Sequence, residues 1–357
     1  MMGDDDRLAH DLATEAGQRL LYLRRRNGFG DAAALRSAGD RLSHEYLTAA
    51  LASHRPSDAV LSEEGKDNPA RLAASRVWIV DPLDGTREFG EAGRTDWAVH
   101  VALWQRVDLA TWPGDAPGEP MPAGWRGQLA AGAVALPADG QTFSTLRTGS
   151  VGAFADRSGS AFADRSGSAG AFAHRRGSVP ASADRRGSVP NSAERRGSAA
   201  ASEEPTGSAP ASARHRWPTG VAMGPSVAHR RSDEADGEAK VRLVVSRTRP
   251  PVFVRGLAAE IGADLIPLGS AGAKIISVLT GAADAYVHAG GQYEWDSAAP
   301  VAVAQAAGLH ASRIDGRPLA YNQPDPRLPD ILVCRLAIAD MLLAAIGRAG
   351  IAEDSQP

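Results

Sequence analysis

The chain has 357 residues and a formal net charge of −3, and 43% of its residues are hydrophobic. This length is enough for two domains or one large one, and the charge argues against a nucleic-acid binder as a whole. The single cysteine, Cys334, excludes an internal disulfide and fits a reducing cytoplasm. Its apolar neighbours at 331–333 predict a buried structural thiol rather than a nucleophile. No run of about 18 apolar residues occurs, so no membrane span is expected.

The N-terminal part, residues 1–150, is predicted to mix helices and strands. Apolar residues at helical spacing predict a helix over 6–26, and a second helix is predicted over 38–54, ending before Pro56. Short apolar runs between turn residues predict strands over 59–61, 77–80, 96–104 and 129–136, with a Pro/Gly-rich loop around 112–124.

The composition changes abruptly near Gly149 and returns to normal near Glu238. A degenerate repeat rich in Gly, Ser, Pro and Arg fills this stretch, and residues 151–231 carry a formal charge of +6. Such a segment cannot bury enough apolar surface to offset the entropy of ordering it, so we predict a disordered insertion over 151–237. The insertion is either a tolerated loop extension or a segment that binds polyanions or is phosphorylated.

The C-terminal part, residues 238–357, shows the same mixture of elements. Strands are predicted over 241–246, 283–288 and 329–335, and helices over 252–261, 270–280, 297–307 and 337–348. The pair Asp315-Gly316 predicts a hairpin turn. Because helices and strands mix throughout both parts, we expect layered α and β elements.

Acidic residues gather at three element ends. Glu63 and Glu64 follow the strand over 59–61, Asp81-Pro82-Leu83-Asp84-Gly85-Thr86 follows the strand over 77–80, and Asp296 opens the helix over 297–307. Taken alone, Asp296 could be only a helix cap, and Glu63-Glu64 could be a solvated turn. The paired acids around the Pro-Leu corner have no such simple explanation, and they form the oxygen cage that Mg²⁺ requires.

Carboxylates around two cations about 4 Å apart form a hydrolytic site. One cation makes a nucleophile of a bound water, and the other stabilises the leaving oxygen. Gly85 and Thr86 are expected to begin a helix whose free N–H groups face a phosphate. The Thr86 hydroxyl could also orient the attacking water.

Three motifs, at 61–64, 78–89 and 295–299, resemble the inositol monophosphatase superfamily. The resemblance runs from the first helix to the last and is interrupted only by the insertion. It implies a layered α/β/α/β/α sandwich and a phosphatase that uses two or three Mg²⁺ ions and is inhibited by lithium.

The resemblance also implies roles for individual residues. Glu63, Asp81 and the carbonyl of Leu83 correspond to the ligands of the first metal ion. Asp81, Asp84 and Asp296 correspond to the ligands of the second.

Glu63 and Thr86 correspond to the residues that position the nucleophilic water. Asp40 matches the acid that supports this threonine, although the Thr-x-x-Asp pattern around it is degraded here. Glu64 is the alternative to Glu63.

The substrate loops resemble the CysQ type, the 3′(2′),5′-bisphosphate nucleotidase branch, which acts on 3′-phosphoadenosine 5′-phosphate. His288 stands where inositol phosphatases have a glutamate, and Lys274 follows a Gly-rich turn where a cation suits a second phosphate. Asp96-Trp97 also resembles that branch. The residues expected to contact the substrate are Gly85, Thr86, Arg87, Ser246, Arg247, Gly269, Ser270, Lys274 and His288.

Two alternatives remain open at this stage. Within the same class, the chain could hydrolyse inositol 1-phosphate or fructose 1,6-bisphosphate. In another class, it could bind RNA or another polyanion through the Arg-rich insertion, with the folded parts as a scaffold. We expect a small phosphorylated substrate, no membrane, no obligatory nucleic acid, a cytoplasmic location and an arrangement compatible with a homodimer.

Overall fold

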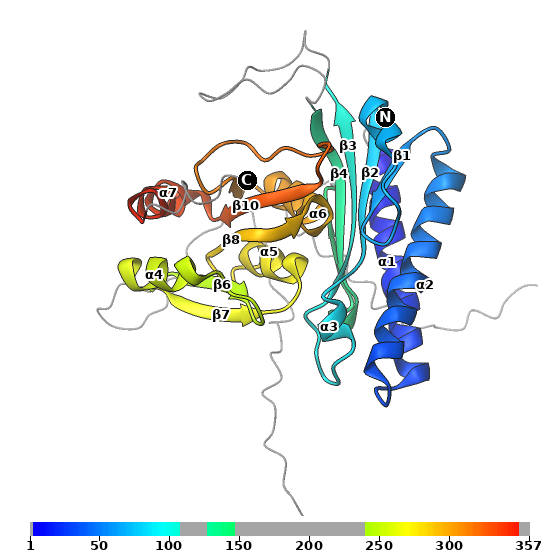
Figure 1. The fold of residues 1–357 in the computed structure, drawn as a ribbon, viewed down its shortest axis with the longest axis horizontal. Coiled ribbons are helices and arrows are strands. Elements are labelled where there is room, and N and C mark those ends of the chain that lie inside the picture. Colours follow the sequence, from blue (N-terminus) through cyan, green and yellow to red (C-terminus); the bar gives the residue numbers. More distant parts are fainter. Residues whose placement is uncertain (1–2, 108–126, 147–239, 350–357) are drawn as a thin grey trace, which may run out of the picture. The chain divides into compact units, whose positions relative to one another are not determined.

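The structure of the protein, a computed structural model, describes residues 3–107, 127–146 and 240–349 (Figure 1). The predicted insertion over 151–237 and the predicted loop around 112–124 lie outside the described residues. Cys334 is completely buried, as predicted. None of the helices within the described ranges is long and apolar enough to cross a membrane.

The N-terminal part forms two helices and a five-stranded sheet. The helices are α1 (Gly3–Asn27) and α2 (Ala32–His54). The strands lie in the order β1 (Ala59–Ser62), β2 (Arg76–Asp84), β3 (Ala98–Arg106), β4 (Gly127–Leu136) and β5 (Gln141–Ser144). β1 pairs with β2 in parallel, and the other neighbours are antiparallel. A single helical turn, α3 (Thr86–Phe89), follows β2.

The C-terminal part forms the second five-stranded sheet, in the order β7-β6-β8-β10-β9. Its strands are β6 (Arg242–Ser246), β7 (Asp264–Leu268), β8 (Ala285–Tyr293), β9 (His310–Ser312) and β10 (Arg327–Cys334). β6 lies parallel to both β7 and β8, whereas β10 is antiparallel to its neighbours. The helices are α4 (Val252–Ile261), α5 (Ala271–Leu279), α6 (Glu294–Ala306) and α7 (Ala339–Arg348).

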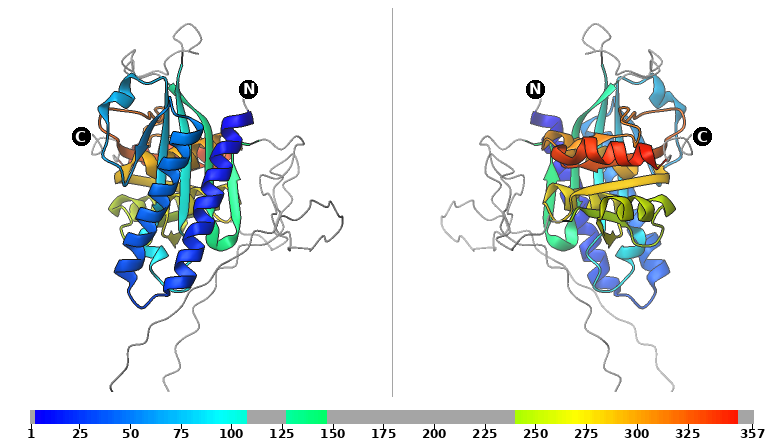
Figure 2. Two further views of the ribbon diagram at one scale, coloured as in Figure 1. Left: turned by 90° about the vertical axis from the view of Figure 1, so that its right-hand side faces the viewer. Right: turned by 90° about the vertical axis from the view of Figure 1, so that its left-hand side faces the viewer.

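These elements stack in five layers. α1 and α2 pack on one face of the first sheet, and α6 packs on its other face against β2, β3 and β4. α5 and α6 also contact the second sheet, whose outer face is covered by α4 and α7. Figure 2 shows α1 and α2 in front of the first sheet from one side, and α4 and α7 in front of the second sheet from the other. This arrangement confirms the predicted layered α/β fold.

Several element boundaries differ from the sequence prediction. The short strands β5, β7 and β9 were not predicted, because none of them contains three consecutive apolar residues. The helix predicted over 297–307 begins earlier, at Glu294. Gly316 forms the predicted turn, with φ of 85°, and the strands on either side of it, β9 and β10, are antiparallel neighbours. The connection between them is long, because β10 begins only at Arg327.

The packing of α6 on the first sheet depends on a glycine. A Cβ on Gly132 of β4 would lie 2.6 Å from the Ala302 Cβ and 3.1 Å from the Ala299 carbonyl oxygen of α6. Only a residue without a side chain therefore lets helix and sheet approach this closely.

We predict that Gly132→Ala lowers the free energy of unfolding by about 1–3 kcal/mol, because the added methyl group forces α6 away from β4. The matched control is Gly256→Ala. Gly256 is an exposed residue of α4, and a Cβ there would have no neighbouring atom within 4 Å. That control should raise stability by up to about 1 kcal/mol. Urea unfolding of both variants measures the difference, and equal stabilities would contradict this account of the contact.

Candidate active site

The two acids of the Pro-Leu corner lie at the end of β2 and point to the same face of the sheet. Along β2, Val77 and Ile79 pack toward α6, while Trp78 and Val80 pack in the cluster formed with α1 and α2. Asp81 continues the first set, because side chains alternate along a strand.

A bulge brings Asp84 to that face as well. In a regular strand, two residues three positions apart would point to opposite faces. Here Asp81 pairs with His100 and Asp84 pairs with Ala98, so β2 has one more residue than β3 over this stretch. The Asp81 Oδ1 accepts a hydrogen bond from the Leu83 N–H at 3.0 Å, which fixes the corner.

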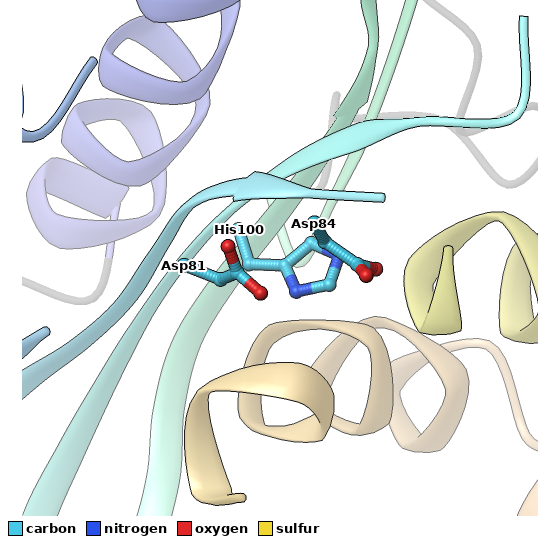
Figure 3. Close-up of side chains that lie close together, drawn as sticks. All are labelled: Asp81, Asp84 and His100. Carbon is cyan, nitrogen blue, oxygen red and sulfur yellow. The ribbon is translucent and has the colours of Figure 1, made fainter. Parts of the chain in front are cut away.

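His100 of β3 lies between the two carboxylates (Figure 3). One ligand atom from each of Asp81, Asp84 and His100 falls within 4.8 Å of the other two, and all three residues are buried. This is a candidate metal site, built where β2 and β3 face α6.

Asp84 is held in its ionised form. Its Oδ2 accepts hydrogen bonds from the Ser270 hydroxyl and, at 2.8 Å, from the Gly272 N–H at the start of α5. Burial would raise the pKa of Asp84, but His100, Lys274 and Ser270 outweigh burial and lower it to about 2.

Three other carboxyl groups in the same place resist ionisation. Burial, and after it the charge of Glu63, raises the pKa of Asp81 well above its ordinary value. Burial and the charge of Asp84 raise the pKa of Asp296 to about 6. Glu63 is exposed as a whole residue, but its carboxyl end lies among the others, and burial followed by the charge of Asp296 raises its pKa to about 7. The end of β1, the corner after β2 and the start of α6 thus contribute acids to one cluster.

This acidic cluster fits divalent cations. Carboxylate oxygens are the ligands that Mg²⁺ prefers, and buried like charges this close together cannot all ionise without a compensating charge. Asp296 is also fixed by its backbone, since its Oδ2 accepts a hydrogen bond from the Tyr293 N–H at 2.6 Å. It therefore combines the role of a helix cap with a place in the cluster.

Thr86 stands beside the cluster at the start of α3. Its hydroxyl donates to the Leu83 carbonyl at 2.9 Å and lies 3.3 Å from the Asp40 Oδ1 of α2. Burial and the charge of Glu64 raise the pKa of Asp40 to about 6. The preceding Gly85 has φ of 83°, and a Cβ there would lie 3.2 Å from the Asp96 carbonyl oxygen, so the turn requires glycine.

A second group of predicted residues follows the carboxyl ends of β6, β7 and β8. These strands run parallel, so the loops after them share one edge of the sheet, the usual place for ligands in such sheets. Ser270 caps α5 by accepting the Ala273 N–H at 2.9 Å. The Gly269 N–H donates to the Asp96 Oδ2 at 2.6 Å, which joins this loop to the loop before β3.

The cations at this edge differ in their surroundings. Arg247 forms ion pairs with Glu88 at 2.7 Å and with Glu91 at 2.9 Å. Lys274 is only 3% exposed, and its Nζ donates to the carbonyls of Gly269 and Ser270. Its charge therefore lies beneath the 269–270 turn rather than on the surface.

His288 of β8 lies near this lysine. Its ring stacks on Tyr286 with centroids 6.1 Å apart, and its buried Nδ1 has no hydrogen-bond partner among the described residues. Burial, and after it the charge of Lys274, lowers the pKa of His288 to about 4, so the ring is neutral. Two predicted contacts remain. Ser246 ends β6 and accepts a hydrogen bond from the Arg249 N–H at 3.2 Å, and Arg87 is exposed.

The place of His100 in this cluster is missed by sequence reasoning, because the residue falls inside the strand predicted over 96–104 and packing alone would explain it there. It is indeed a fully buried strand residue, but it also touches Asp84. The sequence does carry a signal for the direction of the His100 side chain. Alternate residues of β3 point to the same face of the sheet, so His100 shares the face of Ala98 and Trp104, which packs toward α6. The bulge in β2, which decides what His100 meets, leaves no such trace in the sequence.

Comparisons with known proteins find relatives over most of the chain. The sequence model of the inositol monophosphatase family matches residues 6–108 and 221–348. The 3′-phosphoadenosine 5′-phosphate phosphatase of Mycobacterium leprae is 40% identical over 342 residues, which cover 96% of this chain and 93% of that protein. The protein of the same name from Mycobacterium bovis is 38% identical over 335 residues, which cover 94% of this chain and 90% of that protein.

A solved structure shares the fold. CysQ from Bacteroides thetaiotaomicron, a bacterial member of the inositol monophosphatase family, aligns with a TM-score of 0.56 at 22% identity, covering 93% of this chain and 97% of that chain.

We predict that the stabilisation of the protein by Mg²⁺ grows as pH rises from about 5.5 to about 8. Asp81 and Asp296 have raised pKa values in the folded protein. Their contribution to stability without metal is therefore greatest at low pH and is lost as pH rises through those values. A cation replaces the protons, so it binds better as they leave.

Thermal unfolding in EDTA and in Mg²⁺ at several pH values measures this difference. Burial raises the pKa of Glu294 to about 7, so this residue makes stability fall with rising pH in both EDTA and Mg²⁺. Only the difference between the unfolding temperatures in the two buffers therefore reports on the cluster. A Mg²⁺ shift that stayed constant over this pH range would contradict the prediction.

Proposed function

The chain belongs to the inositol monophosphatase family, and from this we propose that it is a Mg²⁺-dependent phosphomonoesterase that removes the 3′-phosphate of 3′-phosphoadenosine 5′-phosphate. The products are AMP and phosphate, as in sulfur assimilation. One observation carries the proposal: carboxyl groups from three distant segments meet beside an edge rich in cations, and curated relatives with this activity in their name match almost the whole chain.

We assign the metal ligands as the sequence predicts. Glu63, Asp81 and the Leu83 carbonyl would hold one ion, and Asp81, Asp84 and Asp296 would hold the other. When bound, paired Mg²⁺ ions lower the pKa of water and offset the charge on the leaving oxygen. Asp84 already has its Oδ2 fixed by α5, which leaves Oδ1 as the oxygen that would face a cation.

Thr86 is placed to orient the attacking water. Its proton is directed to the Leu83 carbonyl or toward Asp40, so the lone pairs of its oxygen remain available to accept a hydrogen bond from water. Glu63 would accept the second hydrogen bond of that water. Asp40 acts through Thr86 as a positioning residue.

The cationic edge suits a substrate with a second phosphate. Lys274 and the backbone of Gly269 and Ser270 border the cluster directly, since Ser270 donates to Asp84. Arg249 follows β6 at the same edge and has no ion-pair partner among the described residues, unlike Arg247. Arg249 is therefore the better placed of the two arginines to meet a phosphate.

The alternatives receive less support. Inositol 1-phosphate is disfavoured because neutral His288 offers no anion to sugar hydroxyls. Fructose 1,6-bisphosphate lacks the nucleobase of the substrate for which the similar proteins are named. No observation favours polyanion binding, because the Arg-rich insertion lies outside the described part of the chain. A cytoplasmic location is proposed from the single buried thiol of Cys334.

We predict that the protein releases phosphate from 3′-phosphoadenosine 5′-phosphate faster than from inositol 1-phosphate or fructose 1,6-bisphosphate, only with Mg²⁺, and less with Li⁺. Asp84→Asn should lower kcat by more than about 100-fold, because even outer partners of metal ligands cost about 10–100-fold. Phosphate release over a panel of esters measures both, with an unchanged thermal unfolding profile in EDTA as the control for folding. Near-normal Mg²⁺-dependent turnover by the variant would remove Asp84 from the site.

We also predict that Lys274→Met and Arg249→Ala each raise KM for the bisphosphate about tenfold, because each removes a charge-assisted contact of about that strength. KM for adenosine 3′-monophosphate should stay nearly unchanged. The matched control is Arg255→Ala, since Arg255 is an exposed arginine on α4. Steady-state kinetics with both nucleotides gives the comparison. Equal effects on the two nucleotides would reject contact with a second phosphate.

A further inference from the structure

His100 joins two parts of the chain that carry proposed metal ligands. Its Nδ1 lies 3.1 Å from the Trp295 carbonyl oxygen of α6, so this nitrogen carries a proton and donates it. Its Nε2 lies 3.1 Å from the Asp84 Oδ2 of β2. Trp295 directly precedes Asp296, so one ring spans the distance between the two segments.

The surroundings of the ring leave it little freedom. His100 is completely buried, and Figure 3 shows its ring lying between Asp81 and Asp84. On the α5 side, a Cβ on Gly272 would lie 2.1 Å from Nε2, so the helix backbone closes directly over this nitrogen. The absence of a side chain at Gly272 is what allows the ring to fit.

Two roles for this histidine can be distinguished. A metal ligand would need open space in front of Nε2, but the backbone of Gly272 and the Asp84 carboxylate occupy its surroundings. Nε2 lies 3.1 Å from the Asp84 Oδ2 but has no hydrogen-bond partner among the described residues. This arrangement favours a residue that places ligands over one that is itself a ligand.

We propose that His100 is a positioning residue that sets the separation of Asp84 and Asp296, and through them the geometry of the second cation. The ring acts as a fixed spacer between β2 and α6. The inference rests on the proposed metal ligands, but it concerns a residue outside them and makes a separate prediction about cation affinity.

Three variants separate the effect of the Nδ1 contact with Trp295 from that of the Nε2 contact with Asp84. His100→Phe keeps a planar ring and removes both nitrogens. His100→Asn keeps a donor near the position of Nδ1, and His100→Gln keeps one near the position of Nε2. The control is Val101→Ala, which truncates a fully buried neighbour that packs in the cluster on the opposite face of β3.

Titration of the substrate-free protein with Mn²⁺, followed by electron paramagnetic resonance, measures the affinity and number of bound cations without turnover. We expect His100→Phe to weaken at least one cation by about 10-fold or more, and His100→Gln and His100→Asn to fall between it and the unaltered protein. Val101→Ala should lower the unfolding temperature but keep the cation affinities. In assays, raising Mg²⁺ should restore kcat of the His100 variants with little change in KM for the nucleotide.

Three results would overturn the inference. Unaltered Mn²⁺ affinity in His100→Phe would exclude a positioning role. An equal loss of Mn²⁺ affinity in Val101→Ala would also exclude it, because that result would indicate general destabilisation. If His100→Phe does not fold, unaltered affinities in both His100→Asn and His100→Gln exclude that role in the same way. Failure of the unaltered protein to bind Mn²⁺ would instead reject the proposed metal site itself.

Discussion

The mutual repulsion of buried carboxyl groups is the constraint on which this site depends. Asp81, Asp296 and Glu63 all have raised pKa values because they are buried and, after that, because their charges are crowded together. Such an arrangement costs stability in the absence of a cation. A divalent ion relieves the cost by replacing protons with a fixed positive charge, so the same crowding that strains the folded protein favours the binding of metal.

Asp84 differs from these three acids, and the difference has a structural cause. Ser270 and Gly272 donate to one of its oxygens, and the nearby His100 and Lys274 side chains lower its pKa. It stays ionised at any physiological pH, whereas the pKa values of its neighbours are raised. The cluster thus always presents the negative charge of Asp84, which can attract a first cation, and that cation then makes ionisation of the other acids more favourable.

Much of this site could be predicted from the sequence, because the acids stand at element ends whose type the apolar pattern indicates. The burial of Asp81 follows from the alternation along β2, and the layered fold follows from the mixture of helices and strands. The bulge that turns Asp84 to the same face depends on pairing with β3, and pairing is not encoded in either strand alone. For the same reason the surroundings of His100 and the burial of Lys274 beneath its turn could not be predicted, since both depend on how α5 and α6 pack.

The packing of α5 and α6 between the sheets connects the chemistry to the fold. α6 reaches the first sheet closely enough to deliver Asp296 because Gly132 has no side chain, and α5 reaches His100 because Gly272 has none. Each glycine lets a helix approach the strand that faces it more closely than a side chain would allow. The proposed cation ligands come from the ends of β1 and β2 and from α6, and the groups that lower the pKa of Asp84 come from β3 and from the start of α5. The distances within the site are therefore distances between layers, and residues far from any substrate can set them.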